Sequence, residues 1–292
     1  MNSSPKRSQI LIALLAVYII WGSTYFAIKL ALPDYPPFLL TGIRLVIAGG
    51  VMLAFVRYKQ YPMPSKSQWR PLVVLAAVMT VFASALVNVA EQTVSSGVVA
   101  IGVAAMPLWA GFFAAMRGYH PSKIEWSGLL LGFLGVLWLN VGSELRISTT
   151  GLLCVLAAPM AWAWGSMWSK DQDLPDPMVS SAWQMLIGSV MSLAIGFALG
   201  ERINHVPSMQ GTLAMLYLTV FGSIVAYSAF VWLVKHVRPA LATSYAYVNP
   251  PIALLLGVTI LHEPLNSHTL VAMVLILISI GIVTLGKRLY NP

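Results

Sequence analysis

The sequence predicts an all-α integral membrane protein with ten transmembrane helices, arranged as two inverted five-helix repeats. Three observations predict this fold. The 292 residues are 58% hydrophobic and 9% charged, whereas soluble domains carry about 25% charged residues. Apolar runs of about 20 residues, long enough to cross a bilayer, recur along the chain. A set of motifs also appears twice at a fixed offset. A chain so poor in charge cannot cover a water-facing surface, so we expect the lipid bilayer to surround it.

The apolar runs are separated by short connections, with no inserted soluble domain. The first run follows Lys6 and Arg7 as a signal peptide would. It continues to Leu32 and carries one copy of a repeated motif, so we expect it to be retained as a helix. Every run is too long and continuous for a strand of a membrane barrel. The ten expected spans are residues 9–31, 37–57, 71–91, 95–116, 124–142, 150–169, 177–199, 210–234, 239–260 and 268–286.

The repeat is defined by residues that recur 143 positions apart. Trp21-Gly22-Ser23 recurs as Trp164-Gly165-Ser166, and Pro107 recurs as Pro250. Because each copy holds five spans, an odd number, the second copy starts on the opposite side of the membrane and is inverted. Inverted repeats around a midplane site are typical of secondary transporters. We therefore expect two domains, at residues 8–142 and 150–286.

The basic residues predict the orientation. Most of the 17 Lys and Arg lie in connections on one side, which places both termini in the cytoplasm. The formal charge of +8 is compatible with nucleic-acid binding, but these residues lie in short loops, so we expect no nucleic-acid partner. The single cysteine, Cys154, lies inside an apolar run, which excludes disulfides and cysteine metal sites. We expect no metal or cofactor.

Small residues and prolines predict how the spans pack and bend. Gly132 and Gly135 follow one side of the fifth span, and Gly188 and Gly196 repeat along the seventh. Small residues at this spacing let helices approach closely in lipid. Proline removes a helical hydrogen bond, so the paired prolines Pro107 and Pro250 are candidate bending points for gating.

Polar and aromatic residues at helical spacing predict a central substrate cavity between the repeats. Aromatic rings would hold an apolar or cationic group, and Arg44 or Lys29 would attract a carboxylate. The residues that we expect to line this cavity are Trp21, Arg44, Asn88, Trp164, Gln184, Tyr227, Tyr245 and Asn249.

Each of these residues has an alternative, structural role. Trp21 and Trp164 lie deep enough in their spans either to line a cavity or to pack against other helices. The amide side chains of Asn88, Gln184 and Asn249 either line the cavity or form hydrogen bonds with a neighbouring helix. Arg44 lies inside its span, where an unpaired charge costs about 2.5 kcal/mol at the bilayer centre. It therefore pairs with Glu91 or faces a substrate. No Asp or Glu lies in the middle of a span. If transport is coupled to protons, Glu91 is the one acid that we expect to be close enough to carry them. The alternatives to proton coupling are exchange and facilitated diffusion.

Four segments carry a family resemblance. They are WGSTYFAIK (Trp21–Lys29), the Arg44 helix, VAIGVAAMPLWAGFFAAM (Val99–Met116) and VNPPIALLLGVTILHEPL (Val248–Leu265). These segments resemble the drug/metabolite transporter superfamily, in particular its ten-helix members with two EamA-type repeats. The most specific motif is the mid-helix proline followed by Glu263-Pro264. The first copy departs from it, with His120-Pro121. The resemblance covers essentially the whole chain and implies an exporter of amino acids, other small metabolites or amphiphilic drugs in the bacterial inner membrane.

The expected function is therefore secondary transport, as an exporter of small organic metabolites that works by alternating access. A facilitative, channel-like protein and a multidrug efflux protein are the alternatives. The sequence has no HExxH, GxSxG or paired central carboxylates, so we expect no enzyme. It also lacks an ATP-binding motif. Substrate, transport direction and coupling ion are not determined by the sequence, and a monomer and a homodimer both remain open.

Overall fold

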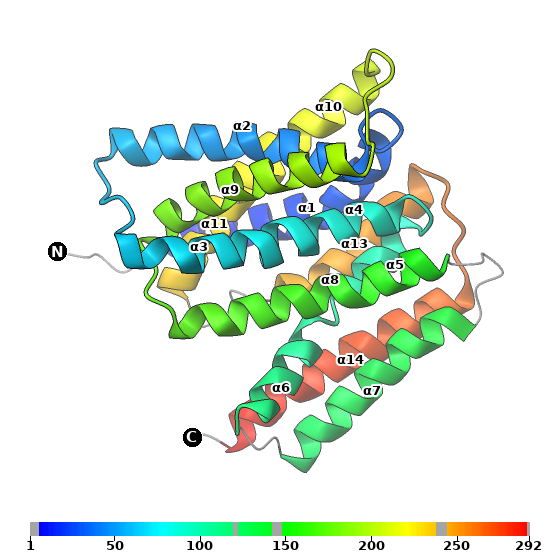
Figure 1. Ribbon diagram of the computed structural model, residues 1–292. Helices are drawn as coiled ribbons and strands as arrows, with labels where there is room; N and C mark the ends of the chain where they lie inside the picture. Colours follow the sequence, from blue (N-terminus) through cyan, green and yellow to red (C-terminus); the bar gives the residue numbers. More distant parts are fainter. Residues whose placement is uncertain (1–5, 119–121, 142–147, 238–243, 291–292) are drawn as a thin grey trace.

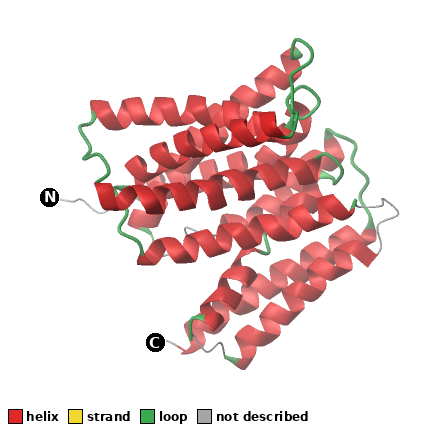
Figure 2. Ribbon diagram, in the orientation of Figure 1, coloured by secondary structure: helices red, strands yellow, loops and turns green. Residues whose placement is uncertain are grey.

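The chain folds into a bundle of long helices joined by short loops (Figures 1 and 2). The computed structural model describes residues 6–118, 122–141, 148–237 and 244–290, and the regular structure within these ranges is all helical. His120 and Pro121, which stand in the first repeat where the second has Glu263-Pro264, lie outside the described residues. All ten predicted spans are present as helices, which confirms the predicted fold class.

Three of the first five spans are single helices. They are α1 (Arg7–Ala31), α2 (Pro37–Tyr58) and α7 (Lys123–Val141). The third span is composite and the fourth is broken. The third consists of α3 (Trp69–Leu75), a π-helical segment (Ala76–Ala83) and α4 (Ser84–Glu91), and the fourth of α5 (Ser96–Val103) and α6 (Met106–Met116).

The last five spans follow the same plan, with one composite member. The single helices are α8 (Thr149–Trp168), α9 (Pro177–Ala198), α13 (Tyr245–Thr259) and α14 (Ser267–Tyr290). The composite eighth span consists of α10 (Met209–Tyr217), a π-helical segment (Leu218–Val225) and α11 (Ala226–His236). Seven of the ten spans contain at least 18 described residues and are apolar enough to cross a membrane.

Local sequence signals fix where several helices begin. Pro37 and Pro177 occupy the first turns of α2 and α9, where the missing N–H costs nothing. Ser148 and Ser208 cap α8 and α10 by accepting hydrogen bonds from backbone N–H groups with their hydroxyl oxygens. Such caps satisfy donors that the first helical turn leaves unpaired. Long apolar runs continue each helix from there.

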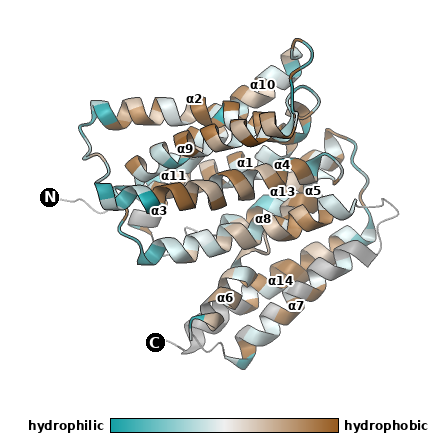
Figure 3. Cartoon of the chain, viewed as in Figure 1, coloured by the Kyte–Doolittle hydropathy of each residue, from teal (hydrophilic) through white to brown (hydrophobic). Residues whose placement is uncertain are grey.

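The two repeats are inverted, as predicted. α1 begins and α14 ends at the same end of the bundle (Figure 1), because ten crossings return the chain to its starting side. Following the predicted orientation, we call this the inner end and the opposite end the outer end. Hydrophobic residues predominate along the helices (Figure 3). Leu130 and Val190, for example, are 63% and 68% exposed, as expected for residues that face lipid.

Equivalent helices of the two repeats pack against each other. α2 pairs with α9, and α7 pairs with α14 at one edge of the bundle (Figure 1). A Cβ atom on Gly132 would collide with Leu108 and Ser279, and one on Gly188 would lie 2.7 Å from Thr80. The small-residue stripes are therefore contact surfaces, in agreement with the predicted packing role.

The two predicted bending points differ. The fourth span is broken at residues 104–105, directly before Pro107, where a proline removes the helical hydrogen bond and crowds the preceding turn. α13 instead continues through Pro250 and Pro251 without interruption. The helix of the first repeat is thus interrupted at this position, while the helix of the second repeat is continuous at the equivalent one.

Two π-helical segments lie at equivalent positions of the repeats. Ala76–Ala83 and Leu218–Val225 begin 142 residues apart, close to the offset of the sequence repeat. π-Helical turns are rare and are frequent at functional sites. Their recurrence indicates that the backbone irregularity belongs to the repeated unit rather than to one helix.

Two glutamates join distant helices at the outer end. Glu201 accepts hydrogen bonds from the backbone N–H groups of Phe38 and Leu39, at the start of α2. Glu263 accepts them from the N–H and hydroxyl of Ser96, at the start of α5. Carboxylates are favourable at the positive end of the helix dipole. These contacts fix where the second and fourth spans start.

Candidate functional site

An aromatic cluster joins α1, α11 and α13. The ring centroid of Trp21 lies 5.2 Å from that of Phe230 and 4.9 Å from that of Tyr245, and the latter two rings are 5.7 Å apart. At one end of the cluster, the hydroxyls of Tyr18 and Ser244 are hydrogen bonded. The cluster therefore presents aromatic faces and edges between three helices.

Trp21 also connects this cluster to the second π-helical segment. Its indole Nε1 donates a hydrogen bond of 3.1 Å to the carbonyl oxygen of Gly222. Gly222 lies inside Leu218–Val225. Rotation or unwinding of that segment would therefore move the indole, which links a backbone irregularity directly to a predicted cavity residue.

A polar contact ties α4 to the start of α2. The Nδ2 atom of Asn88 donates hydrogen bonds to the carbonyl oxygen of Pro37 and to the hydroxyl of Thr41, at 3.1 and 2.8 Å. Asn88 is fully buried, and its Oδ1 atom has no hydrogen-bond partner in the described part of the chain. Asn88 thus fulfils the predicted structural role with one end of its amide and leaves the other end available.

Arg44 lies one helical turn beyond Thr41 and so shares its face of α2. Its Nε atom is buried without a hydrogen-bond partner, and the ion pairs found among the described residues do not include it. The sequence left open an Arg44–Glu91 pair and an Arg44 that faces a substrate. The described structure does not form that pair.

Glu91 and Lys29 are close without a carboxylate–ammonium contact. The Nζ atom of Lys29 donates to the backbone carbonyl oxygens of Glu91 and Val94, at 2.6 and 3.0 Å. Lys29 therefore closes the end of α4, which is favourable because a helix C-terminus carries partial negative charge. The carboxylate of Glu91 is buried and has no partner among the described residues.

Asn249, on α13, adds another buried polar atom of this kind. Its Oδ1 atom has no partner in the described structure, and the residue is 7% exposed. Buried polar groups in native proteins are nearly always hydrogen bonded, so such an atom marks a place where water or a ligand group can bind. Among the described residues, Arg44, Asn88 and Asn249 carry such atoms on the second, third and ninth spans. Trp183, His268 and the carboxyl group of Glu91 carry the others.

The other predicted cavity residues are placed differently. The hydroxyl of Tyr227 lies 2.8 Å from that of Ser181 and ties α11 to α9. Gln184 donates to Ser180 one turn earlier in α9. Trp164 stacks on Trp168, with centroids 5.7 Å apart, and is 37% exposed. The structure thus brings Trp21 and Tyr245 into contact, but Trp164 is not part of this aromatic cluster.

Two members of the site were not predicted as cavity residues. Phe230 completes the aromatic cluster, and it lies three residues after Tyr227, a spacing that marks one helical face. Tyr25 is buried in a cluster with Ala90 and Val94, which flank Glu91, and lies one helical turn from Trp21 on α1. Helical spacing was therefore the signal available for both residues.

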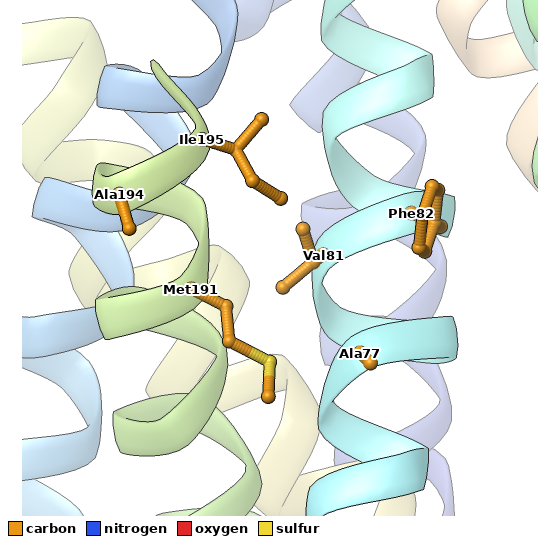
Figure 4. Close-up of a pocket in the computed structure, with 6 residues that line it drawn as sticks. All are labelled: Ala77, Val81, Phe82, Met191, Ala194 and Ile195. Carbon is orange, nitrogen blue, oxygen red and sulfur yellow. The ribbon is translucent and has the colours of Figure 1, made fainter. Parts of the chain in front are cut away.

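A separate cavity of about 250 Å³ lies between α9 and the third span (Figure 4). All of its lining side chains are apolar, so it offers no group that would orient a polar metabolite. The six lining residues are Ala77, Val81 and Phe82 of the third span and Met191, Ala194 and Ile195 of α9. Within the described residues, no group of His, Cys, Asp and Glu is placed to hold a metal ion.

Comparison with known proteins identifies the family. The sequence profile of the EamA-like transporter family matches this chain twice, over residues 8–141 and 149–285. The inner membrane transporter YedA of Escherichia coli is 37% identical over 279 residues, which cover 95% of this chain and 91% of YedA. A chloroplastic WAT1-related protein of Arabidopsis thaliana is 28% identical and covers 92% of this chain and 68% of its own length.

More distant similarity extends over the same length. The transporter YoaV of Bacillus subtilis is 25% identical and covers 92% of this chain and 94% of its own. A crystal structure with 21% sequence identity superposes with a TM-score of 0.68, over 97% of this chain and 100% of that chain, and supports the fold. The family profile spans both halves of this chain, and its relatives YedA and YoaV are named as transporters rather than enzymes. This chain therefore belongs to the EamA-like transporter family and is a multi-pass membrane transporter.

Proposed function

We propose that this transporter exports small organic metabolites, amino-acid-like or amphiphilic compounds, across a bacterial inner membrane by alternating access. The observation that carries the proposal is the buried Nε atom of Arg44, which has no hydrogen-bond partner among the described residues. A guanidinium in a membrane span needs a counter-ion, water or an anionic ligand group. A substrate carboxylate supplies two acceptors that fit its planar donors.

The aromatic cluster of Trp21, Phe230 and Tyr245 supplies the complementary apolar surface. Aromatic faces bind apolar or cationic groups. A metabolite with a carboxylate at one end and an apolar or ammonium-bearing body would therefore use both parts of the site. The amide oxygens of Asn88 and Asn249, which have no hydrogen-bond partner among the described residues, are acceptors for an ammonium group.

Alternating access is supported by the inverted repeats and by the different shapes of the fourth and ninth spans. Secondary transporters of this design rock one repeat against the other around a fixed site. The export direction rests on the resemblance to exporters. The inner-membrane location rests on the name of the relative YedA and on the basic residues of the inner loops.

Counterflow in liposomes tests this function. Purified protein would be reconstituted into vesicles preloaded in turn with each member of an L-amino-acid panel and with amphiphilic cations. Uptake of external tracer against the internal unlabelled compound establishes a carrier and identifies the substrate class. Flux without saturation or exchange would instead favour a channel-like protein. Exchange of the cations alone would favour multidrug efflux.

Arg44→Gln separates a substrate-binding arginine from a structural one. For substrates with a carboxylate we expect counterflow to fall about tenfold to a hundredfold, because hydrogen bonds to charged groups contribute about 1.5–3 kcal/mol. The matched control is Arg57→Gln, which removes an exposed arginine from the last turn of the same helix. Unchanged counterflow in a folded Arg44→Gln protein would exclude substrate binding by Arg44.

A further inference from the structure

Glu91 is the last residue of α4 and is fully buried. Neither carboxylate oxygen has a hydrogen-bond partner in the part of the chain that the structure describes. The adjoining residues Ala90 and Val94 belong to an apolar cluster, which includes Val99 and Ala100 of α5. An ionised carboxylate in such surroundings is strongly unfavourable, whereas a protonated, neutral carboxyl group is tolerated.

The other glutamates at this end of the bundle show that the fold can satisfy a carboxylate when the charge is to be kept. Glu201 and Glu263 each accept hydrogen bonds from backbone N–H groups at a helix start. Glu91 receives no such donor. A glutamine could occupy its position with the same shape, so the acid adds one property to this site, the ability to release a proton.

The ionisable groups around Glu91 come from several helices. Lys29 and Tyr25 on α1 and Glu263 interact electrostatically with Glu91. Lys29 is the positively charged member of this group, and its Nζ atom donates a hydrogen bond to the backbone carbonyl oxygen of Glu91. Cys154 of α8 lies in the same apolar cluster, and Arg44 lies on the neighbouring α2. Rotation of the Glu91 side chain toward Lys29 would convert a buried neutral acid into an ion pair.

We propose that Glu91 is a proton-binding site that couples substrate movement to a proton gradient, with Lys29 as the counter-ion of its ionised form. The inference rests on the proposed function of a carrier. When the surrounding helices open, the O–H bond of the carboxyl group breaks and its proton passes to water on the open side. The carboxylate that remains pairs with the Lys29 ammonium. After reorientation, a proton from water on the opposite side restores the neutral acid.

The position of Glu91 fits two-sided access. Gln92 and Thr93, the next two residues, are exposed at the outer end, so a small opening there brings water to the carboxyl group. Towards the inner end, Asn88 and Ser84 continue the same face of the third span. The unpartnered Oδ1 atom of Asn88 is a second acceptor on this face.

Infrared spectroscopy tests proton binding without a substrate. Purified wild-type protein would be titrated from acidic to alkaline pH while the carbonyl stretch of protonated carboxylic acids is recorded. We expect a band that disappears on ionisation, that is absent in Glu91→Gln and that persists in Glu201→Gln. The control changes a carboxyl group of the same end of the bundle that is already paired. A titrating band retained in full by Glu91→Gln would overturn the proposal.

A flux assay tests the coupling itself. Vesicles that exchange a member of the L-amino-acid panel would be exposed to pH gradients of either sign, and accumulation of that amino acid would be measured. We expect gradient-driven accumulation by wild-type protein and by Glu201→Gln. In Glu91→Gln we expect counterflow to continue while gradient-driven accumulation is lost.

The possible failures are distinguishable. Wild-type protein that shows counterflow but no response to either gradient would overturn proton coupling and leave the carrier function intact. Loss of counterflow from wild-type protein itself would overturn the proposed function. Full gradient-driven accumulation by Glu91→Gln would remove Glu91 from the coupling step.

Discussion

Trp21 and Trp164 occupy equivalent positions of the two repeats but have different surroundings. Trp21 donates a hydrogen bond to Gly222 and packs in the aromatic cluster. Trp164 stacks on Trp168 and is partly exposed. Both helices contact the π-helical segment of the opposite repeat. The duplication therefore preserved the scaffold, while the side-chain contacts of the two copies diverged.

The fourth and ninth spans show the same divergence at the backbone level. The span with Pro107 is broken, whereas α13 passes through Pro250 uninterrupted. In a transporter built from inverted repeats, a state that is open to one side has equivalent elements in two different conformations. Under the proposed alternating access, the described structure would be one state of the cycle, with the fourth span interrupted and the ninth span continuous.

The largest expected effect comes from removing the two equivalent tryptophans separately. Trp21→Ala loses a hydrogen bond of about 1 kcal/mol and two aromatic contacts of about 0.5–1.5 kcal/mol each. Because Trp21 would also face the substrate in the proposed site, where an aromatic contact contributes about 0.5–1.5 kcal/mol, we expect counterflow to fall about tenfold. Trp164→Ala loses one stacking contact at a partly exposed position, and we expect a change of about twofold or less. Equal losses would show that the two positions act alike despite their different contacts.

The adjoining glycines test whether the packing asymmetry has energetic consequences. A Cβ atom on Gly22 would lie 2.9 Å from Cβ and Cγ2 of Ile252, and the β-branched side chain cannot easily yield. A Cβ atom on Gly165 would meet the thioether of Met79, which is flexible and can move. Thermal unfolding in detergent should show a loss of about 1–3 kcal/mol for Gly22→Ala and less than about 1 kcal/mol for Gly165→Ala.

The opposite ranking, or two equal losses, would contradict this account of the helix contacts. Gly50, on α2, offers a control because a Cβ atom there would meet nothing within 4 Å. Gly50→Ala should leave stability unchanged or raise it slightly, since alanine favours the helix by about 1 kcal/mol.

The sequence was sufficient for the spans and for their inversion because both depend on local, repeated signals. Apolar run length predicted the helices, and the fixed spacing of Trp-Gly-Ser and proline predicted the duplication. The same signal marked Pro107 and Pro250 as bending points, but the helix is interrupted near Pro107 and continues through Pro250. Each of these features can be obtained from neighbouring residues or from a comparison of the two halves.

The contacts of the candidate site were less predictable because they depend on helix rotation and long-range approach. The interaction of Glu263 with Ser96 spans 167 residues, and Lys29 reaches the carbonyl oxygens of another helix. The π-helical segments carry no proline or unusual residue run that marks them. Helical spacing places Trp164 and Trp21 alike, so it could not show that one packs inward and the other stays partly exposed.

The smallest expected effect concerns two aspartates that follow the first span of each repeat. Asp34 accepts hydrogen bonds from the Ser208 hydroxyl and from the His205 ring, and it thereby ties this loop to the loop before α10. Asp176 instead caps its own helix through the N–H of Met178. The hydrogen bond from Ser208, followed by that from His205, lowers the pKa of the Asp34 carboxyl below its ordinary value.

A carboxyl group with a lowered pKa stabilises the folded state above its unfolded-state pKa, and this contribution is lost as the pH falls through the folded-state pKa. We therefore expect the thermal unfolding temperature of wild-type protein to fall more steeply on acidification than that of Asp34→Asn, which should be the less stable of the two near neutral pH. Asp176→Asn is the matched control, because asparagine caps a helix as well as aspartate does, and its acid profile should follow the wild type. If Asp34→Asn and wild-type protein lose stability in parallel on acidification, the charge of Asp34 contributes nothing to the stability that its hydrogen bonds with Ser208 and His205 provide. The difference between the two aspartates would then be one of geometry alone.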